Sequence, residues 1–276
     1  MTTRLLREED FEQLYETFTT AFATNAVRFQ LSKDDFDYRI NKKLLINREI
    51  SAATFDGNEM VGFILHTSNL YEGIPTAYNG GTGVLPGFRN QRTAEQIYGY
   101  LIPKIQSLFL ARVILEVVES NEKAIALYEK IGFEARRKFK CYKLEKTLDF
   151  TSEHEVFEGE VEDIDFSYND FHPSFVDSEE QLKRAGEKIL LVYDGEENVQ
   201  GYLVMQPHLG RISQIAVNRI NRHKKIGEAL IRTAQKYTSK PLFIMNIPEE
   251  QQGFDSFLKN CGFQNQVNQY EMELII

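Results

Sequence analysis

The sequence has little cysteine and no tryptophan among its 276 residues. Its two cysteines, Cys141 and Cys261, provide neither a disulfide framework nor a thiolate metal cluster. Three of the five histidines, His154, His172 and His208, are scattered without the spacing of metal ligands. We therefore expect no metal site.

Long apolar runs are also missing. No stretch approaches the roughly 20 apolar residues that a membrane helix needs. The first ten residues are charged and lack the apolar region of a secretory signal. We expect a soluble cytoplasmic protein with no membrane partner.

Positive charge is in deficit. The chain has 32 Lys and Arg against 41 Asp and Glu, a formal net charge of -9. A general nucleic-acid binder normally shows the opposite balance, so we expect no nucleic-acid partner. Hydrophobic residues make up 42% of the chain, which is enough for a core and excludes wholesale disorder.

The expected elements repeat along the chain. In each half an apolar strand leads into a helix, a second strand and a short helix that ends at glycine. These elements are expected at 76–85, 92–109, 113–118 and 122–131, and again at 212–218, 224–237, 242–247 and 254–260. Pro103 is expected to kink or divide its helix. With the acidic stretch 148–165 as the boundary zone, we predict two domains, 1–147 and 148–276.

A basic loop follows the first strand of each repeat. The first copy continues from Val84 and Leu85 into Arg89-Asn90-Gln91-Arg92-Thr93-Ala94. The second continues from Val217 into Arg222-His223-Lys224-Lys225-Ile226-Gly227. The first N–H groups of a helix and its dipole attract anions, and Arg or Lys adds charge-assisted contacts. A single copy would be an ordinary solvated helix start, but a second pattern accompanies the first copy.

The second pattern comprises Asn121, Ala124, Tyr128, Gly132 and Phe133. Together, the two patterns resemble those of the GNAT superfamily of N-acetyltransferases, Arg-x-x-Gly-x-Gly/Ala followed by Asn and Ala-x-x-x-Tyr-x-x-x-Gly-Phe. Arg92 and Lys225 replace the middle glycine of that family. The second half resembles the family more faintly, because Leu258 stands opposite Tyr128.

The resemblance implies an α+β (layered α/β) architecture of two tandem GNAT-like domains. Each would have a mixed, mostly antiparallel sheet flanked by helices. It implies an N-acetyltransferase, an acyltransferase that moves the acetyl group of acetyl-CoA to a primary amine by direct attack. The acceptor would be a small molecule or a peptide, and the protein a monomer or homodimer.

The resemblance also assigns residues to roles. Tyr128 would be the general acid toward the leaving thiolate. Coenzyme A would contact Val84, Leu85, Arg89, Asn90, Gln91, Arg92, Thr93, Ala94, Asn121 and Ala124, and in the second half Val217, Arg222, His223, Lys224, Lys225 and Gly227.

Purely structural roles are the alternatives for several of these residues. Tyr128 also fits a packed core tyrosine, and Asn121 a plain helix cap. Glu116, in an otherwise apolar strand, is either a general base acting through water or structural. Tyr78 and Asn79 are candidates to line the acceptor pocket, whereas His66 is expected to pack.

Three other functions compete with acetyl transfer. A non-catalytic acyl-CoA-binding or sensor protein would use the same loops. A nucleotide-binding protein would use the same helix start, but the sequence contains no Gly-x-Gly-x-x-Gly or P-loop string. Two packed domains without any ligand are the structural alternative.

Overall fold

The structure is a computed structural model that describes residues 1–23, 31–146 and 153–276. The chain forms two compact units, one of Met1–Arg136 with Glu271–Ile276 and one of Arg137–Tyr270. Each unit is an α+β fold with helices packed on a central sheet, as predicted. The predicted boundary at residues 147 and 148 lies outside the described residues, and the two domains that it defines stay a prediction.

Unit 1 is built on the strand order β1-β2-β3-β4-β5-β12. Its strands are β1 (Thr2–Leu5), β2 (Ala52–Asp56), β3 (Glu59–Tyr71), β4 (Ile74–Val84), β5 (Arg112–Val118) and the last residues of β12 (Gln264–Ile275). Strands β1 to β4 pair antiparallel, and β4 pairs with β5 parallel. The sheet is therefore mixed and mostly antiparallel where these pairings define it.

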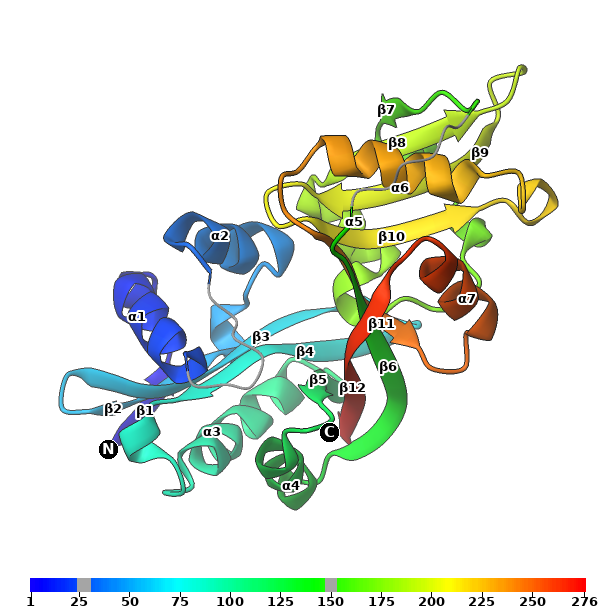
Figure 1. Cartoon of the computed structure of the whole chain (residues 1–276). Helices are drawn as coiled ribbons and strands as arrows, with labels where there is room; N and C mark the ends of the chain where they lie inside the picture. The colour runs from blue at the N-terminus through cyan, green and yellow to red at the C-terminus, as the bar shows by residue number, and fades with distance from the viewer. Residues whose placement is uncertain (24–30, 147–152) are drawn as a thin grey trace. The chain divides into compact units, whose positions relative to one another are not determined.

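In the described residues of unit 1, four α-helices cover this sheet. They are α1 (Phe11–Phe22), α2 (Lys33–Tyr38), α3 (Thr93–Ser107) and α4 (Glu122–Ile131). Helix α1 lies over one face of the sheet, and α3 and α4 lie over the other (Figure 1). Ser32 caps α2 by accepting the Asp35 N–H at 3.1 Å, as its position predicts. Helix α3 is undivided and continues through Pro103.

Unit 2 repeats the arrangement with the order β12-β6-β11-β10-β9-β8-β7. Its strands are β6 (Glu134–Leu144, from Arg137 onward), β7 (Phe157–Gly159), β8 (Lys188–Tyr193), β9 (Val199–Gln206), β10 (Arg211–Val217), β11 (Leu242–Pro248) and the first part of β12. Its helices are α5 (Glu179–Ala185), α6 (Ile226–Lys236) and α7 (Gln252–Asn260). None of the described helices is both long and apolar enough to cross a bilayer.

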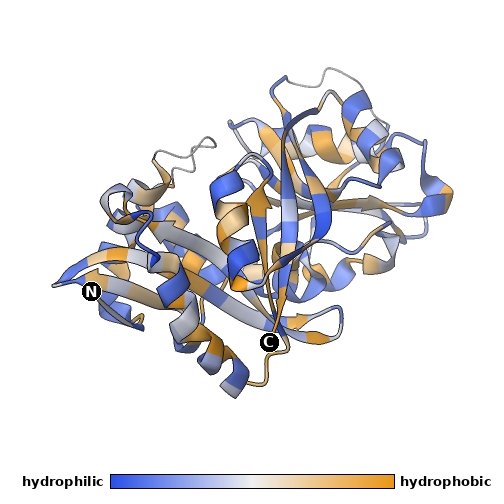
Figure 2. Cartoon of the chain, turned by 90° about the horizontal axis from the view of Figure 1, so that it is seen from below, coloured by the Kyte–Doolittle hydropathy of each residue, from blue (hydrophilic) through white to orange (hydrophobic). Residues whose placement is uncertain are grey.

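Alternating side chains build the core of unit 2 on both faces of its sheet. Leu203 and Met205 pack with α6 and α7, whereas Tyr202 and Val204 pack with α5 on the other face. This period of two is what a strand buried on both faces requires. The helices carry both apolar and polar residues, as the mixed colours in Figure 2 show.

The last strand of each sequence repeat contributes to the other unit. The end of β12 completes unit 1, where Ile276 N–H donates to the Ala111 carbonyl at 3.0 Å and Glu273 pairs with Arg112 at 2.7 Å. Strand β6 contributes Arg137–Leu144 to unit 2, where it pairs antiparallel with β11. The repeated motifs did not predict this exchange.

His66 is a buried histidine in unit 1 that packs, as expected. Its side chain is fully inaccessible, its Nδ1 lies 2.7 Å from the Ile50 carbonyl oxygen, and its ring meets Tyr98 edge-on. Burial lowers the pKa of His66 from 6.5 to about 4, although the Ile50 carbonyl opposes this shift. The His66 imidazole therefore binds a proton more tightly in the unfolded chain than in the folded one.

We expect this burial to make unit 1 sensitive to acid. The contribution of the neutral His66 to the free energy of unfolding is fully present above pH 6.5 and is lost as pH falls toward 4. At pH 4.5 the loss should be about 2–3 kcal/mol. In urea unfolding at pH 7 and pH 4.5, His66→Gln should shrink the difference between the two pH values by this amount. The exposed His172→Gln should leave the difference as in the wild type, and an equal effect of both variants would contradict the assignment.

Candidate active site

Two neighbouring strands of unit 1 part to form a fork. Strands β4 and β5 pair only from Thr76 opposite Arg112 to Tyr78 opposite Ile114, although both strands continue for several more residues. At this point β4 contains a bulge, because the register against β3 shifts between Asn79 and Gly81. A bulge bends its strand and strengthens its twist. The fork therefore exposes a backbone edge of β4 on the side facing β5.

The direction of the β4 amides decides which of them face the fork. Leu85 N–H donates to the Val61 carbonyl at 2.9 Å and so points toward β3. Because successive residues of a strand point their amides to opposite sides, Val84 and Thr82 direct theirs toward the fork. The Leu85 amide is thus already bonded to β3, so the Val84 amide, rather than that of Leu85, is placed to donate to a ligand in the fork.

The loop from β4 to α3 has the form of an anion cradle. Asn90 and Arg92 are left-handed, with φ of 62° and 60°, and Arg92 is the N-cap of α3. Alternation of right- and left-handed residues turns successive N–H groups inward, and such nests bind anions at helix starts. Arg92 thus adopts a conformation that glycine would adopt without steric cost.

The remaining loop residues have different roles. Arg89 donates from Nε to the Val84 carbonyl at 3.1 Å and from Nη2 to the Ala21 carbonyl at 2.8 Å, so it ties β4 to the end of α1. Gln91 donates to the Gly87 carbonyl. The side chains of Thr93 and Ala94 are buried, which leaves only their backbone N–H groups for a ligand.

Tyr128 lies in a buried polar network between α4 and the fork. Its hydroxyl lies close enough to the Thr82 side chain for Thr82 to lower the pKa of the phenol. Asn79 donates to Thr82 Oγ1 at 2.8 Å and to the Tyr98 hydroxyl at 2.5 Å. Burial raises the pKa of Tyr128 above 10, while Thr82 opposes the rise. The phenol thus keeps its proton at neutral pH, beside a residue of the fork edge.

Tyr128 belongs to a packed group of aromatic rings as well as to this polar network. Tyr128 does pack, edge-on against Tyr98 and Phe133 at ring distances of 6.4 and 5.5 Å. Packing does not exclude proton donation, because the phenol lies beside Thr82 of the fork edge. No sequence signal identified Thr82, which stands between two glycines of β4, or Tyr98.

Glu116 and Tyr78 are brought together on neighbouring strands. The half-buried Glu116 lies on β5, and the Tyr78 hydroxyl donates to its carboxylate. Both stand where β4 and β5 begin to part, since Tyr78 is in their last paired position. A carboxylate at the fork is suited to accept a proton or to hold a cationic amine.

Asn121 is a helix cap, and Ala124 follows it in the first turn of α4. The Asn121 side chain accepts the Ala124 N–H at 3.3 Å. Cap and ligand contact are both possible for this exposed residue, but the capping bond is the role that the structure defines.

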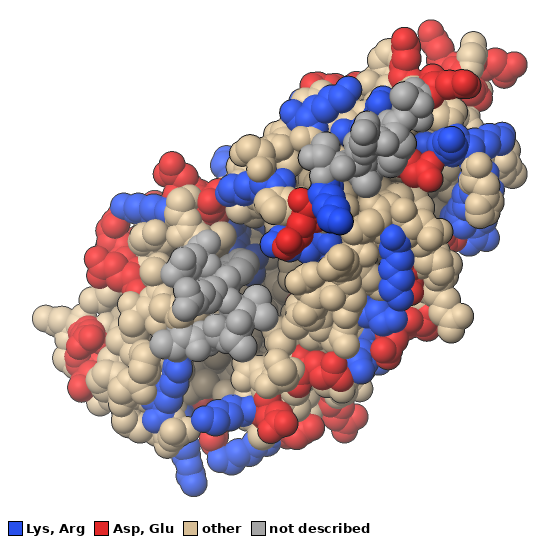
Figure 3. All heavy atoms as spheres, in the orientation of Figure 1, with Lys and Arg blue, Asp and Glu red and all other residues tan. Residues whose placement is uncertain are grey.

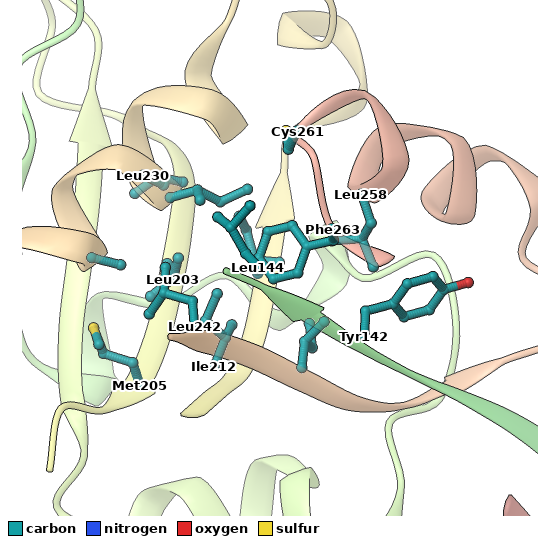
Figure 4. Close-up of a cluster of buried hydrophobic side chains, with 14 of the residues drawn as sticks. Tyr142, Leu144, Leu203, Met205, Ile212, Leu230, Leu242, Leu258, Cys261 and Phe263 are labelled. Carbon is teal, nitrogen blue, oxygen red and sulfur yellow. The ribbon is translucent and has the colours of Figure 1, made fainter. Parts of the chain in front are cut away.

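Unit 2 reproduces the loop geometry with other side chains. His223 and Lys225 are left-handed with φ of 61° and 64°, and Arg222 Nε donates to the Val217 carbonyl at 3.2 Å. Lys224 donates to Asn221, and Gly227 is buried at the start of α6. Leu258, the counterpart of Tyr128, is fully buried in an apolar cluster that includes Phe263 (Figure 4).

Charge is dispersed over the surface. On the face drawn in Figure 3, acidic and basic side chains are interspersed rather than gathered into one field. Within the described residues, no group of three or more His, Cys, Asp or Glu is arranged to hold a metal ion.

Comparisons with known proteins agree on the fold. Residues 10–133 match a sequence model of the acetyltransferase (GNAT) family. A tandem GNAT protein from the clavulanic acid biosynthesis pathway has a TM-score of 0.74 at 13% identity, covering 99% of this chain and 98% of that one. A putative acetyltransferase from Pyrococcus horikoshii has a TM-score of 0.72 at 16% identity, covering 100% of this chain and 89% of that one. A GCN5-related N-acetyltransferase from Sphaerobacter thermophilus has a TM-score of 0.71 at 13% identity, covering 99% of this chain and 95% of that one.

Identities this low establish a shared fold and nothing finer. A search of curated proteins found no match.

Proposed function

We propose that unit 1 transfers an acetyl group from acetyl-CoA to a primary amine, because residues 10–133 match a sequence model of the acetyltransferase (GNAT) family. The amine belongs to a small molecule or a peptide and attacks the thioester directly. The single observation that carries the proposal is the fork, where an open β4 edge, an anion cradle and a buried phenol meet on one side of unit 1.

The residues of unit 1 would hold coenzyme A, whose thioester supplies the activated acetyl group. The N–H groups at the start of α3 and the Arg92 side chain would bind the pyrophosphate. The Val84 amide faces the fork, where a thioester carbonyl needs a hydrogen-bond donor. Ala124 is small and half-buried, which leaves space beside the pantetheine arm.

Two groups of unit 1 would move protons. Tyr128 would donate its proton to the leaving thiolate, because its raised pKa keeps it protonated at neutral pH. Glu116 would receive the proton of the attacking amine, directly or through water, and Tyr78 would orient its carboxylate.

A thiol-release assay tests the proposal. With acetyl-CoA and a panel of primary amines, free thiol should appear only when an amine is present, and mass spectrometry should find the acetylated amine. The alternative, a non-catalytic acyl-CoA-binding or sensor protein, predicts stabilisation by coenzyme A but no thiol release with any amine. No thermal shift with coenzyme A would contradict both readings.

Arg92→Gly should raise stability and weaken coenzyme A binding. A left-handed non-glycine residue costs about 1–2 kcal/mol. Glycine also stabilises the unfolded state by about 0.4–1 kcal/mol, because it gives the unfolded chain more conformational freedom. We therefore expect the free energy of unfolding, measured in urea, to rise by about 0.5 kcal/mol. Loss of one charge-assisted contact to phosphate should raise the Kd of coenzyme A about tenfold in calorimetry.

A matched control lies away from the fork. Glu197 has a φ of 63° in a turn of unit 2, and Glu197→Gly should give a similar gain in stability with unchanged binding. If Arg92→Gly bound coenzyme A as tightly as the wild type, the side chain would make no contact with the cofactor.

A further inference from the structure

The fork of unit 2 is filled by side chains of its own chain. Strands β10 and β11 pair at Arg211 with Phe243 and at Ile212 with Ile244, and β10 has a bulge directly after Ile212. Both strands continue to Val217 and Pro248. This is the same fork as that of β4 and β5 in unit 1, so its contents can be compared position by position.

The residues that line the two forks differ in size. With Arg89 opposite Arg222, Gly81 of β4 corresponds to Gln214 of β10. With Gly132 opposite Gly262, Ala124 of α4 corresponds to Phe254 of α7. A small residue has been replaced by a large one at both positions.

A segment before α5 enters this fork. Phe171 meets Phe254 edge-on at a ring distance of 5.5 Å, and both pack against the main core cluster of unit 2. The cavity that remains between the segment and the two strands is about 20 Å³, enough for about one water molecule. A pantetheine arm requires a continuous channel, which is much larger than this cavity.

Hydrogen bonds hold the segment in place on both strands. Asn169 donates to Gln214 Oε1 at 3.1 Å, and Tyr202 donates to the same oxygen at 2.8 Å. On β11, Asn246 donates to Ser174 Oγ at 3.1 Å. Gln214 and Asn246 are buried, so displacement of the segment would cost each of them a hydrogen bond that water could not readily replace.

A carboxylate of the same segment already pairs with the loop of unit 2. Asp170 lies 2.9 Å from Arg222 Nη2 and 3.4 Å from Arg219 Nη2. Arg222 corresponds to Arg89, which instead donates to backbone carbonyls. An incoming pyrophosphate would therefore compete with an internal anion, Asp170, at this loop of unit 2.

We propose that residues 169–174 occupy the cofactor site of unit 2, with Phe171 in the fork and Asp170 on the loop arginine, so that the chain binds one acyl-CoA and not two. Val217, Arg222, His223, Lys224, Lys225 and Gly227 then shape a closed copy of the site and hold no cofactor. The count of one rests on the function proposed for unit 1, whereas the occupation of unit 2 does not.

Paired glycine variants test the count. Arg92 and Lys225 are the left-handed N-caps of α3 and α6, so Arg92→Gly and Lys225→Gly should both fold with a small gain in stability. Native mass spectrometry with coenzyme A should find one molecule per wild-type chain. The Kd should rise about tenfold in Arg92→Gly and stay within about twofold in Lys225→Gly. Two bound molecules, or equal weakening in both variants, would overturn the proposal.

A tryptophan probe tests the occupied fork without relying on unit 1. The chain has no tryptophan, so Phe171→Trp introduces a single emitter, and Phe109→Trp, at a side chain 87% exposed, is its solvent-exposed reference. Phe171→Trp should emit at shorter wavelength than the reference, resist acrylamide quenching and stay unchanged with saturating coenzyme A.

Emission and quenching like those of the exposed reference, or a shift toward them when coenzyme A is added, would overturn the proposal. Phe254→Trp reports the same ring contact from α7. It serves as a second probe in case the larger ring of Phe171→Trp itself displaces the segment. If neither unit binds coenzyme A but the probe stays buried, the function proposed for unit 1 fails while the occupied fork stands.

Discussion

Tyr128→Phe should lower kcat for acetyl transfer about 100-fold, because a positioned general acid contributes roughly 10²–10⁴ to the rate. The ring would stay packed against Tyr98 and Phe133, so folding and the KM for acetyl-CoA should change little. The raised pKa also predicts that wild-type kcat shows no decline below about pH 10 from loss of this proton. Steady-state kinetics across pH measures both effects.

Tyr100→Phe is the matched control. Tyr100 lies on α3, where Lys104 sits over its ring, and it is not part of the Thr82 network. It should retain wild-type kcat. Unchanged turnover in Tyr128→Phe would show that the assigned acid is wrong and would leave Tyr128 as a core tyrosine.

Arg112→Met should destabilise unit 1 by about 3 kcal/mol. Arg112 is 3% exposed and donates to Glu273 at 2.7 Å, to the Tyr71 carbonyl at 2.8 Å and to Glu72 at 3.2 Å. Removing one partner of a buried ion pair costs about 3–5 kcal/mol, because the other partners keep their desolvation cost. We expect the lower end, since both carboxylates are partly exposed and Glu72 also pairs with Arg136.

The variant should also loosen the end of β12. Urea unfolding measures the free energy, and hydrogen exchange of residues 271–276 should become faster than in the wild type. Lys33→Met removes the exposed pair with Glu12 and should leave the free energy of unfolding nearly unchanged. An Arg112→Met variant as stable as this control would contradict the role of the network.

Local patterns predicted the elements that depend on neighbours in the sequence. Helix α4 begins at its Asn121 cap and ends at Gly132, whose φ of 112° suits glycine. The loops before α3 and α6 follow from the same kind of pattern, and their left-handed residues at equivalent positions agree with the predicted repeat. Caps and tight turns form within a few residues, which is why the sequence alone indicates them.

Long-range pairing decided the rest. Whether the Leu85 or the Val84 amide faces the fork depends on the partner strand, here β3. Tyr78 meets Glu116 because two strands 38 residues apart lie side by side.

The sequence by itself predicted the α+β fold, the resemblance to the GNAT family and a repeated basic loop before a helix, because these follow from local spacing. Tertiary structure alone showed the exchange of β6 and β12 between units and placed Phe171 against Phe254 and Asp170 beside Arg222. Strand partners and the occupants of a fork are chosen by packing and hydrogen bonding between distant segments, and no local pattern encodes that choice.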